Sequence, residues 1–154
     1  MAAEFAIMTL TEPQAVLRMV VAALAGGAIG WNRYVAGKPA GLRTHMLVSA
    51  GAALFVLIPL LVTGSEAAGA LGRTLQGVAT GIGFLGAGEI IHQIGSDRAV
   101  VQGLTAVAAI WLTAAIGMAA ACGRWLVTGC AVALALIFLS GPSRLEEAFP
   151  PRHG

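Results

Sequence analysis

Long stretches without a charged side chain are the feature that most restricts what this chain can fold into. Residues 44–65 are 22 consecutive positions without Lys, Arg, Asp or Glu, and residues 99–123 are 25 more. A helix needs about 20 apolar residues to cross the roughly 30 Å hydrocarbon core of a bilayer. Charged residues make up only 10% of the chain, against about 25% in soluble domains. The sequence therefore predicts a membrane protein.

Five apolar segments of about the length of a membrane span can be counted, and we predict an all-α, polytopic membrane helical bundle. The first runs from about Thr11 to about Trp31, and the second is residues 44–65. The third spans residues 74–94, and the last two are residues 99–123 and 125–143. Short connections make neighbouring helices antiparallel. We expect one transmembrane domain over residues 1–144 and a short polar tail over residues 145–154.

Basic residues indicate the orientation, because cytoplasmic loops carry an excess of Lys and Arg. With five spans and the N-terminus outside, six basic residues lie at the inner ends of the helices and three at the outer ends. We therefore predict an N-out, C-in topology. The inner group is Arg33, Lys38, Arg43, Arg98, Arg144 and Arg152, and the outer group is Arg18, Arg73 and Arg124.

The small residues predict how the helices pack, since they let helix backbones approach each other in lipid. Gly26 and Gly30 form a ladder with Ala22 on the first helix. Five glycines on the third helix predict neighbours on two sides, or else a broken helix that lines an ion path. One face of it holds Gly77, Gly81 and Gly88, and the nearly opposite face holds Gly83 and Gly86. A ladder on the fourth helix consists of Gln102, Ala106, Ala109, Thr113 and Gly117.

Polar side chains gather at the predicted inner ends of the helices. The ends of the first and third helices meet the starts of the second and fourth helices there. We expect this inner-face polar cluster to be either a functional site or a ring of interface anchors. Its members are Asn32, Arg33, Arg43, His45, Glu89, His92, Asp97, Arg98 and Gln102.

Glu89 is the most informative member, because it lies about 8 Å inside the third span. A charge at the centre of a membrane helix costs about 2.5–3.5 kcal/mol, so such a carboxylate needs a reason to be there. His92 follows three residues later, close enough to interact with it. The pair is a candidate site for Mg²⁺ or a proton, or else Glu89 is a structural carboxylate. No other cofactor is expected.

Other classes of function find no support in the sequence. The net charge is +2, Lys38 is the single lysine, and no run of basic residues could follow a phosphate backbone. We therefore expect no nucleic-acid partner. The chain has no G-x-S-x-G, H-E-x-x-H, Walker A or Rossmann motif, so we do not expect an enzyme.

Four ordered blocks resemble the MgtC/SapB family of bacterial membrane proteins. They are GWNR at residues 30–33, GKPAGLRTH at 37–45, GIGFLGAG at 81–88 and GLTAVAAIWLTAAIG at 103–117. The resemblance covers about residues 15–140. It implies a bacterial inner-membrane protein connected with magnesium limitation, from a family associated with survival inside host cells.

The chain departs from this family at two polar positions. The family usually has an acidic residue where Asn32 stands and an arginine where Gln102 stands. Many members also carry a soluble C-terminal domain, and we expect these residues to hold the transmembrane domain only.

Two functions follow from the residues and the resemblance together. The first is an accessory or regulatory role in magnesium homeostasis. It would be exercised in the bilayer through helix–helix contacts with another copy of the chain or another membrane protein. The alternative is a transporter or channel for Mg²⁺ or protons, with Glu89 and His92 in the path.

Overall fold

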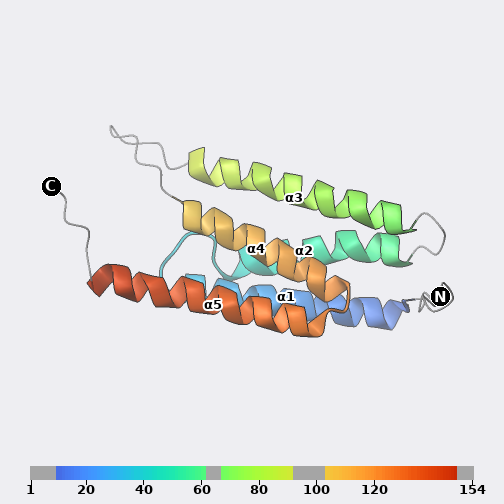
Figure 1. Cartoon of the computed structure of the whole chain (residues 1–154), viewed down its shortest axis with the longest axis horizontal. Coiled ribbons are helices and arrows are strands. Elements are labelled where there is room, and N and C mark those ends of the chain that lie inside the picture. Colours follow the sequence, from blue (N-terminus) through green and yellow to red (C-terminus); the bar gives the residue numbers. More distant parts are fainter. Residues whose placement is uncertain (1–9, 62–66, 92–102, 149–154) are drawn as a thin grey trace, which may run out of the picture.

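The computed structural model describes residues 10–61, 67–91 and 103–148, and it contains five α-helices there (Figure 1). They are α1 (Glu12–Val35), α2 (Leu42–Leu61), α3 (Ala67–Ile91), α4 (Leu104–Ala121) and α5 (Trp125–Ala148). The described part of the chain has no strand. The predicted all-α, five-helix fold is confirmed. α3 runs unbroken through its glycines, so the broken-helix alternative is not what the structure shows.

Neighbouring helices run in opposite directions, as the short connections predict (Figure 1). α1, α3 and α5 run one way along the bundle, and α2 and α4 run the other way. Val35, Leu42, Ile91 and Leu104 therefore all lie at one end, which we call the loop end. The opposite end holds the starts of α1, α3 and α5.

Three helices form the centre of the bundle, because α1, α2 and α4 all contact one another. α3 packs against α2 and α4, and α5 packs against α1 and α4. The core consists largely of small side chains such as Ala22, Ala53 and Ala120, which are completely buried. Small residues let the helix axes come close, which is how helices gain contact in lipid.

Large apolar side chains cover the outside of the bundle. Leu126 is 81% exposed and Phe84 is 80% exposed. α1, α2 and α4 are each long and apolar enough to cross a membrane, and α5 has a shorter apolar stretch, Trp125–Gly141. The bundle thus has an apolar outer surface, and its helices pack through small residues. Both features suit a protein surrounded by lipid and not by water. The structure is that of a membrane-embedded helical bundle.

Two tight turns close the helix ends in the same way. After α1, the N–H of Gly37 donates to the Tyr34 carbonyl (3.0 Å) and that of Lys38 to the Arg33 carbonyl (3.0 Å). Gly37 has φ +63°, the left-handed conformation that this Schellman motif requires. Gly123 has φ +69° and ends α4 by the same pattern of hydrogen bonds.

Candidate functional site

The crossing of α1 and α2 at the loop end is built on two glycines. A Cβ on Gly30 would lie 2.7 Å from the Leu42 Cα atom. A Cβ on Gly26 would collide with the His45 carbonyl oxygen and lie 2.7 Å from the Ser49 Cβ atom. The two backbones therefore touch where only glycine fits. This contact buries His45 and Ser49 completely.

Ser49 ties three helices together. Its hydroxyl donates a 2.7 Å hydrogen bond to the Ala22 carbonyl of α1. On the other side, Gly117 of α4 faces the Ser49 backbone, and a Cβ there would collide with the Ser49 carbonyl oxygen. Sequence analysis did not select Ser49, although a serine in the middle of an otherwise apolar helix is a signal that could have found it.

Arg33 and His45 form a buried polar pair within the bundle at the loop end. Arg33 is 6% exposed and His45 is 0% exposed. The Arg33 charge is within electrostatic range of the His45 ring. Nδ1 of His45 lies 3.1 Å from the Gly41 carbonyl, so that nitrogen carries the proton and donates it. Nε2 of His45 and Nε of Arg33 are buried without a hydrogen-bond partner among the described residues.

The structure brings only part of the predicted polar cluster together. Asn32 is half-buried, and its side-chain amide donates a 2.8 Å hydrogen bond to the Ser140 hydroxyl of α5. Arg43 is exposed on the outside of the bundle. Asn32 therefore links α1 to α5.

The candidate metal site is only partly described. Glu89 is half-buried on α3, which makes no contact with α1. Among the described residues, no three His, Cys, Asp or Glu side chains are grouped so that they could hold a metal ion. The remaining predicted members lie outside the described residues. They are His92, Asp97, Arg98 and Gln102.

The glycines of α3 differ in their surroundings. Gly86 is buried, and a Cβ there would lie 2.5 Å from Cγ1 of Val107 on α4. At the other four glycines that the sequence analysis assigned to the third span, a Cβ would meet nothing within 4 Å. Within this chain, these four do not approach a neighbouring helix as Gly26 and Gly30 do. They are Gly77, Gly81, Gly83 and Gly88.

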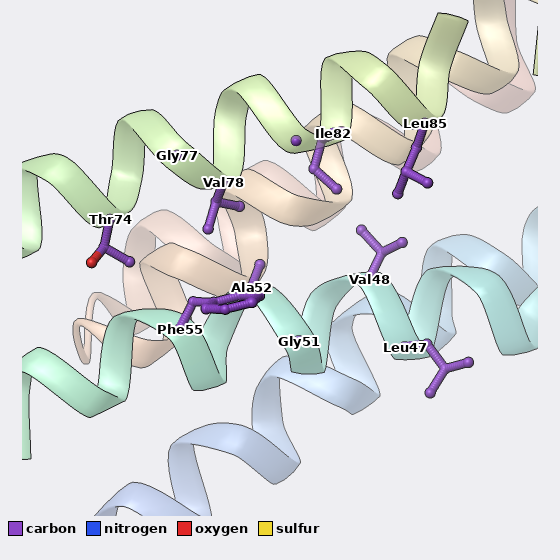
Figure 2. A pocket seen from close by; sticks show the side chains of 11 residues that line it. Leu47, Val48, Gly51, Ala52, Phe55, Thr74, Gly77, Val78, Ile82 and Leu85 are labelled. Carbon is purple, nitrogen blue, oxygen red and sulfur yellow. The ribbon is translucent and has the colours of Figure 1, made fainter. Parts of the chain in front are cut away.

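An open apolar crevice of about 610 Å³ lies between α2 and α3, beside the residues through which these two helices pack (Figure 2). We call it the α2–α3 crevice. Figure 2 shows Val48 of α2 and Val78 and Ile82 of α3 pointing into the space between the two helices. The single hydroxyl on its walls, that of Thr74, is bonded within α3 to the Ala70 carbonyl (3.0 Å). The crevice is lined by Leu47, Val48, Gly51, Ala52, Phe55, Thr74, Gly77, Val78, Gly81, Ile82 and Leu85.

Arg18 has a structural role that the sequence did not indicate. Its Nη1 donates a 2.8 Å hydrogen bond to the Ala121 carbonyl in the last turn of α4. A Cβ on Gly123 would lie 3.0 Å from Nη2 of the same guanidinium group. A positive charge at a helix C-terminus is favourable, because the free carbonyl groups carry partial negative charge. Arg18 therefore fastens α4 to α1 at the end opposite the loop end.

Comparison with known proteins finds relatives over most of the chain. The chain is 46% identical to protein SrpB of Synechococcus elongatus over 137 residues, which cover 84% of this chain and 75% of SrpB. It is 41% identical to "Putative magnesium transporter YhiD" of Escherichia coli K12 over 115 residues, or 71% of this chain and 52% of YhiD. It is 35% identical to protein MgtC of Salmonella typhimurium over 133 residues, or 86% of this chain and 53% of MgtC.

The chain thus spans about half the length of YhiD and of MgtC. No solved structure matches it. The model of the MgtC family matches residues 19–148, which is most of the chain and includes all of α2, α3 and α4. This membrane-embedded five-helix chain belongs to the MgtC family.

Proposed function

We propose that this chain is a non-enzymatic accessory or regulatory protein of the bacterial inner membrane that supports magnesium homeostasis. It acts by binding a transmembrane helix of another protein molecule in the α2–α3 crevice. Membership of the MgtC family and the magnesium role in the name of YhiD support the physiological part. The shape of the crevice supports the mode of action.

The observation that carries the proposal is the set of open glycines on the walls of the crevice. Gly51 of α2 and Gly77 and Gly81 of α3 line it, and a Cβ on any of them would meet nothing within 4 Å. Elsewhere in the chain, Gly26, Gly30 and Gly117 are each covered by another helix. Small residues let a helix approach closely, and close packing drives helix association in lipid. These open positions would allow a helix from outside the chain to approach α2 and α3 closely.

The buried hydroxyl groups favour regulation over transport. A path for Mg²⁺ needs several oxygen ligands facing one another. The Ser49 hydroxyl is bonded to the Ala22 carbonyl, and the Thr113 hydroxyl is bonded to the Ala109 carbonyl of its own helix (2.8 Å). Both groups contribute to packing and leave no aligned set of free oxygens between α1, α2 and α4 among the described residues.

Gly81→Leu should block the crevice without disturbing the fold, because the added side chain meets no atoms of the chain within 4 Å at its Cβ. In a strain that lacks the gene, we expect this variant to be made at the normal level and to lose most of its support of growth under magnesium limitation. Gly129→Leu is the matched control, since Gly129 lies on α5 with the same open surroundings. It should support growth normally.

Normal growth with Gly81→Leu would refute the crevice as the working surface. Gly51→Leu is a second variant, on the opposite wall of the crevice. It tests whether the loss of growth comes from blocking the crevice and not from a local effect on α3, and it should reduce growth as Gly81→Leu does. The size of the purified complex in mild detergent identifies the occupant. If the native complex has a mass that is a multiple of the chain mass, and Gly81→Leu lowers that mass, the occupant is another copy of the chain. If the size of the complex is the same in the native protein and in Gly81→Leu, the occupant is a different protein.

The orientation completes the proposal. We infer from the six basic residues against three that the loop end and the C-terminus face the cytoplasm. A reporter enzyme that is active only in the cytoplasm, fused after Gly154, should therefore be active. Activity only from a periplasmic reporter would reverse the proposed orientation.

A further inference from the structure

A hollow of about 570 Å³ lies on the outside of the bundle where α1 ends and α2 begins. We call it the α1–α2 hollow. Trp31 and Tyr34 form one side, with ring centroids 5.9 Å apart and exposures of 57% and 65%. The volume is within the range of small-ligand sites, which is about 300–1,000 Å³. The hollow is lined by Trp31, Tyr34, Gly41, Leu42, Arg43 and Thr44.

The position of the hollow places it at the surface of the bilayer. α1 has 24 residues and is therefore about 36 Å long, slightly more than the hydrocarbon core. Its last turn, with Trp31 and Tyr34, lies where lipid headgroups meet the acyl chains. Trp and Tyr are enriched at this depth. Leu47, one turn further along α2, is 73% exposed and continues the surface as an apolar face.

The charged side chain that lines the hollow is positive. Arg43 is exposed and lines it, and Lys38 is exposed in the loop nearby. No acidic residue occurs anywhere between Glu12 and Glu66 in the sequence. A guanidinium group and a hydroxyl group, those of Arg43 and Thr44, are suitable donors to a phosphate. An exposed cation at this depth attracts anionic lipid.

We propose that the α1–α2 hollow binds an anionic phospholipid, with the lipid phosphate at Arg43 and Thr44 and an acyl chain along the apolar face beyond Leu42. A phospholipid matches both parts of the surface, the polar upper part and the apolar lower part. An anionic headgroup is favoured over one that bears an ammonium group, because the ammonium would lie among the positive side chains of Arg43 and Lys38.

Tryptophan quenching by brominated lipid tests this directly. Trp111→Phe together with Trp125→Phe leaves Trp31 as the single tryptophan, and both replaced rings are about half exposed, so phenylalanine is accommodated there. The full chain is placed in phosphatidylcholine vesicles with an equal mole fraction of either brominated phosphatidylglycerol or brominated phosphatidylcholine. Phosphatidylglycerol should quench Trp31 more strongly. Arg43→Gln should reduce this preference roughly fivefold.

Lys38→Gln is the matched charge control, because it removes one positive charge from the loop just before α2 without changing the lining of the hollow. It should retain most of the preference. Equal quenching by the two lipids in the protein with native Arg43 would overturn the proposal. So would an equal loss in Lys38→Gln and Arg43→Gln, which indicates diffuse attraction without a site. Abolition of the preference by inorganic phosphate would assign the hollow to a free anion.

Discussion

Gly117→Leu is expected to destabilise the bundle severely. A Cβ at this position would collide with the Ser49 carbonyl oxygen and lie 2.9 Å from the Ser49 carbonyl carbon. These are backbone atoms in the middle of α2, so they cannot move aside as the end of a side chain can. Separating α4 from α2 would also expose the Ser49 hydroxyl bond to Ala22. Overpacking typically costs 1–3 kcal/mol, and we expect a loss of at least about 3 kcal/mol here.

The free energy of unfolding in mixed detergent micelles, followed by circular dichroism, measures this effect. Gly129→Leu serves again as the control, because it adds the same side chain where nothing lies within 4 Å. It should unfold as the native protein does. A Gly117→Leu variant of native stability would contradict the described contact between α2 and α4.

Arg18→Met is expected to lower the free energy of unfolding by about 2 kcal/mol, since hydrogen bonds to charged groups contribute about 1.5–3 kcal/mol. Methionine keeps the apolar stem and removes the donor to the Ala121 carbonyl. The Ala121 carbonyl in the last turn of α4 then loses its side-chain hydrogen-bond donor, and no other described side chain replaces it. The same unfolding measurement detects the change.

Arg124→Met is the comparison for that variant. Arg124 is exposed, and only its backbone N–H closes the turn after α4, by a 3.0 Å hydrogen bond to the Ala119 carbonyl. Its side chain can be replaced at a cost within about 0.5 kcal/mol, as is usual on a surface. Equal losses for the two variants would mean that Arg18 stabilises the protein through its charge alone and not through the hydrogen bond to α4.

The helices could be predicted from the sequence because the bilayer restricts them so strongly. A segment that crosses hydrocarbon must form its backbone hydrogen bonds within the protein. In a chain of this kind, an uncharged stretch of about 20 residues therefore forms a helix. The antiparallel order then follows from short connections. Thr11 illustrates how local the signal is, since its N–H bonds to Oε1 of Gln14 (3.2 Å) at the predicted start of α1.

The surroundings of individual side chains could not be predicted in the same way. Helical spacing says which residues share a face, but it does not say which neighbour covers that face. The sequence predicts one polar cluster for Arg33 and Arg43, whereas in the structure Arg33 is buried and Arg43 is exposed. Arg43 precedes His45 by two residues and so lies about 200° around α2 from the face that packs against α1.

The glycines of α3 show the same limit. Their spacing predicts close neighbours, and Gly86 has one in Val107, whereas Gly81 faces the open crevice. A sequence pattern for helix packing is the same whether the neighbour belongs to this chain or to another molecule. The structure of one chain separates these cases, and it is this separation that supports a role in binding other helices.

Magnesium flux into liposomes that contain the purified chain distinguishes a helix-binding regulator from a transporter, because the two differ in this one property. For a regulator, we expect the rate of Mg²⁺ entry, read with an enclosed fluorescent indicator, to equal that of protein-free liposomes with and without a pH gradient. Magnesium entry that depends on the protein and is abolished by Glu89→Gln would contradict the regulatory role.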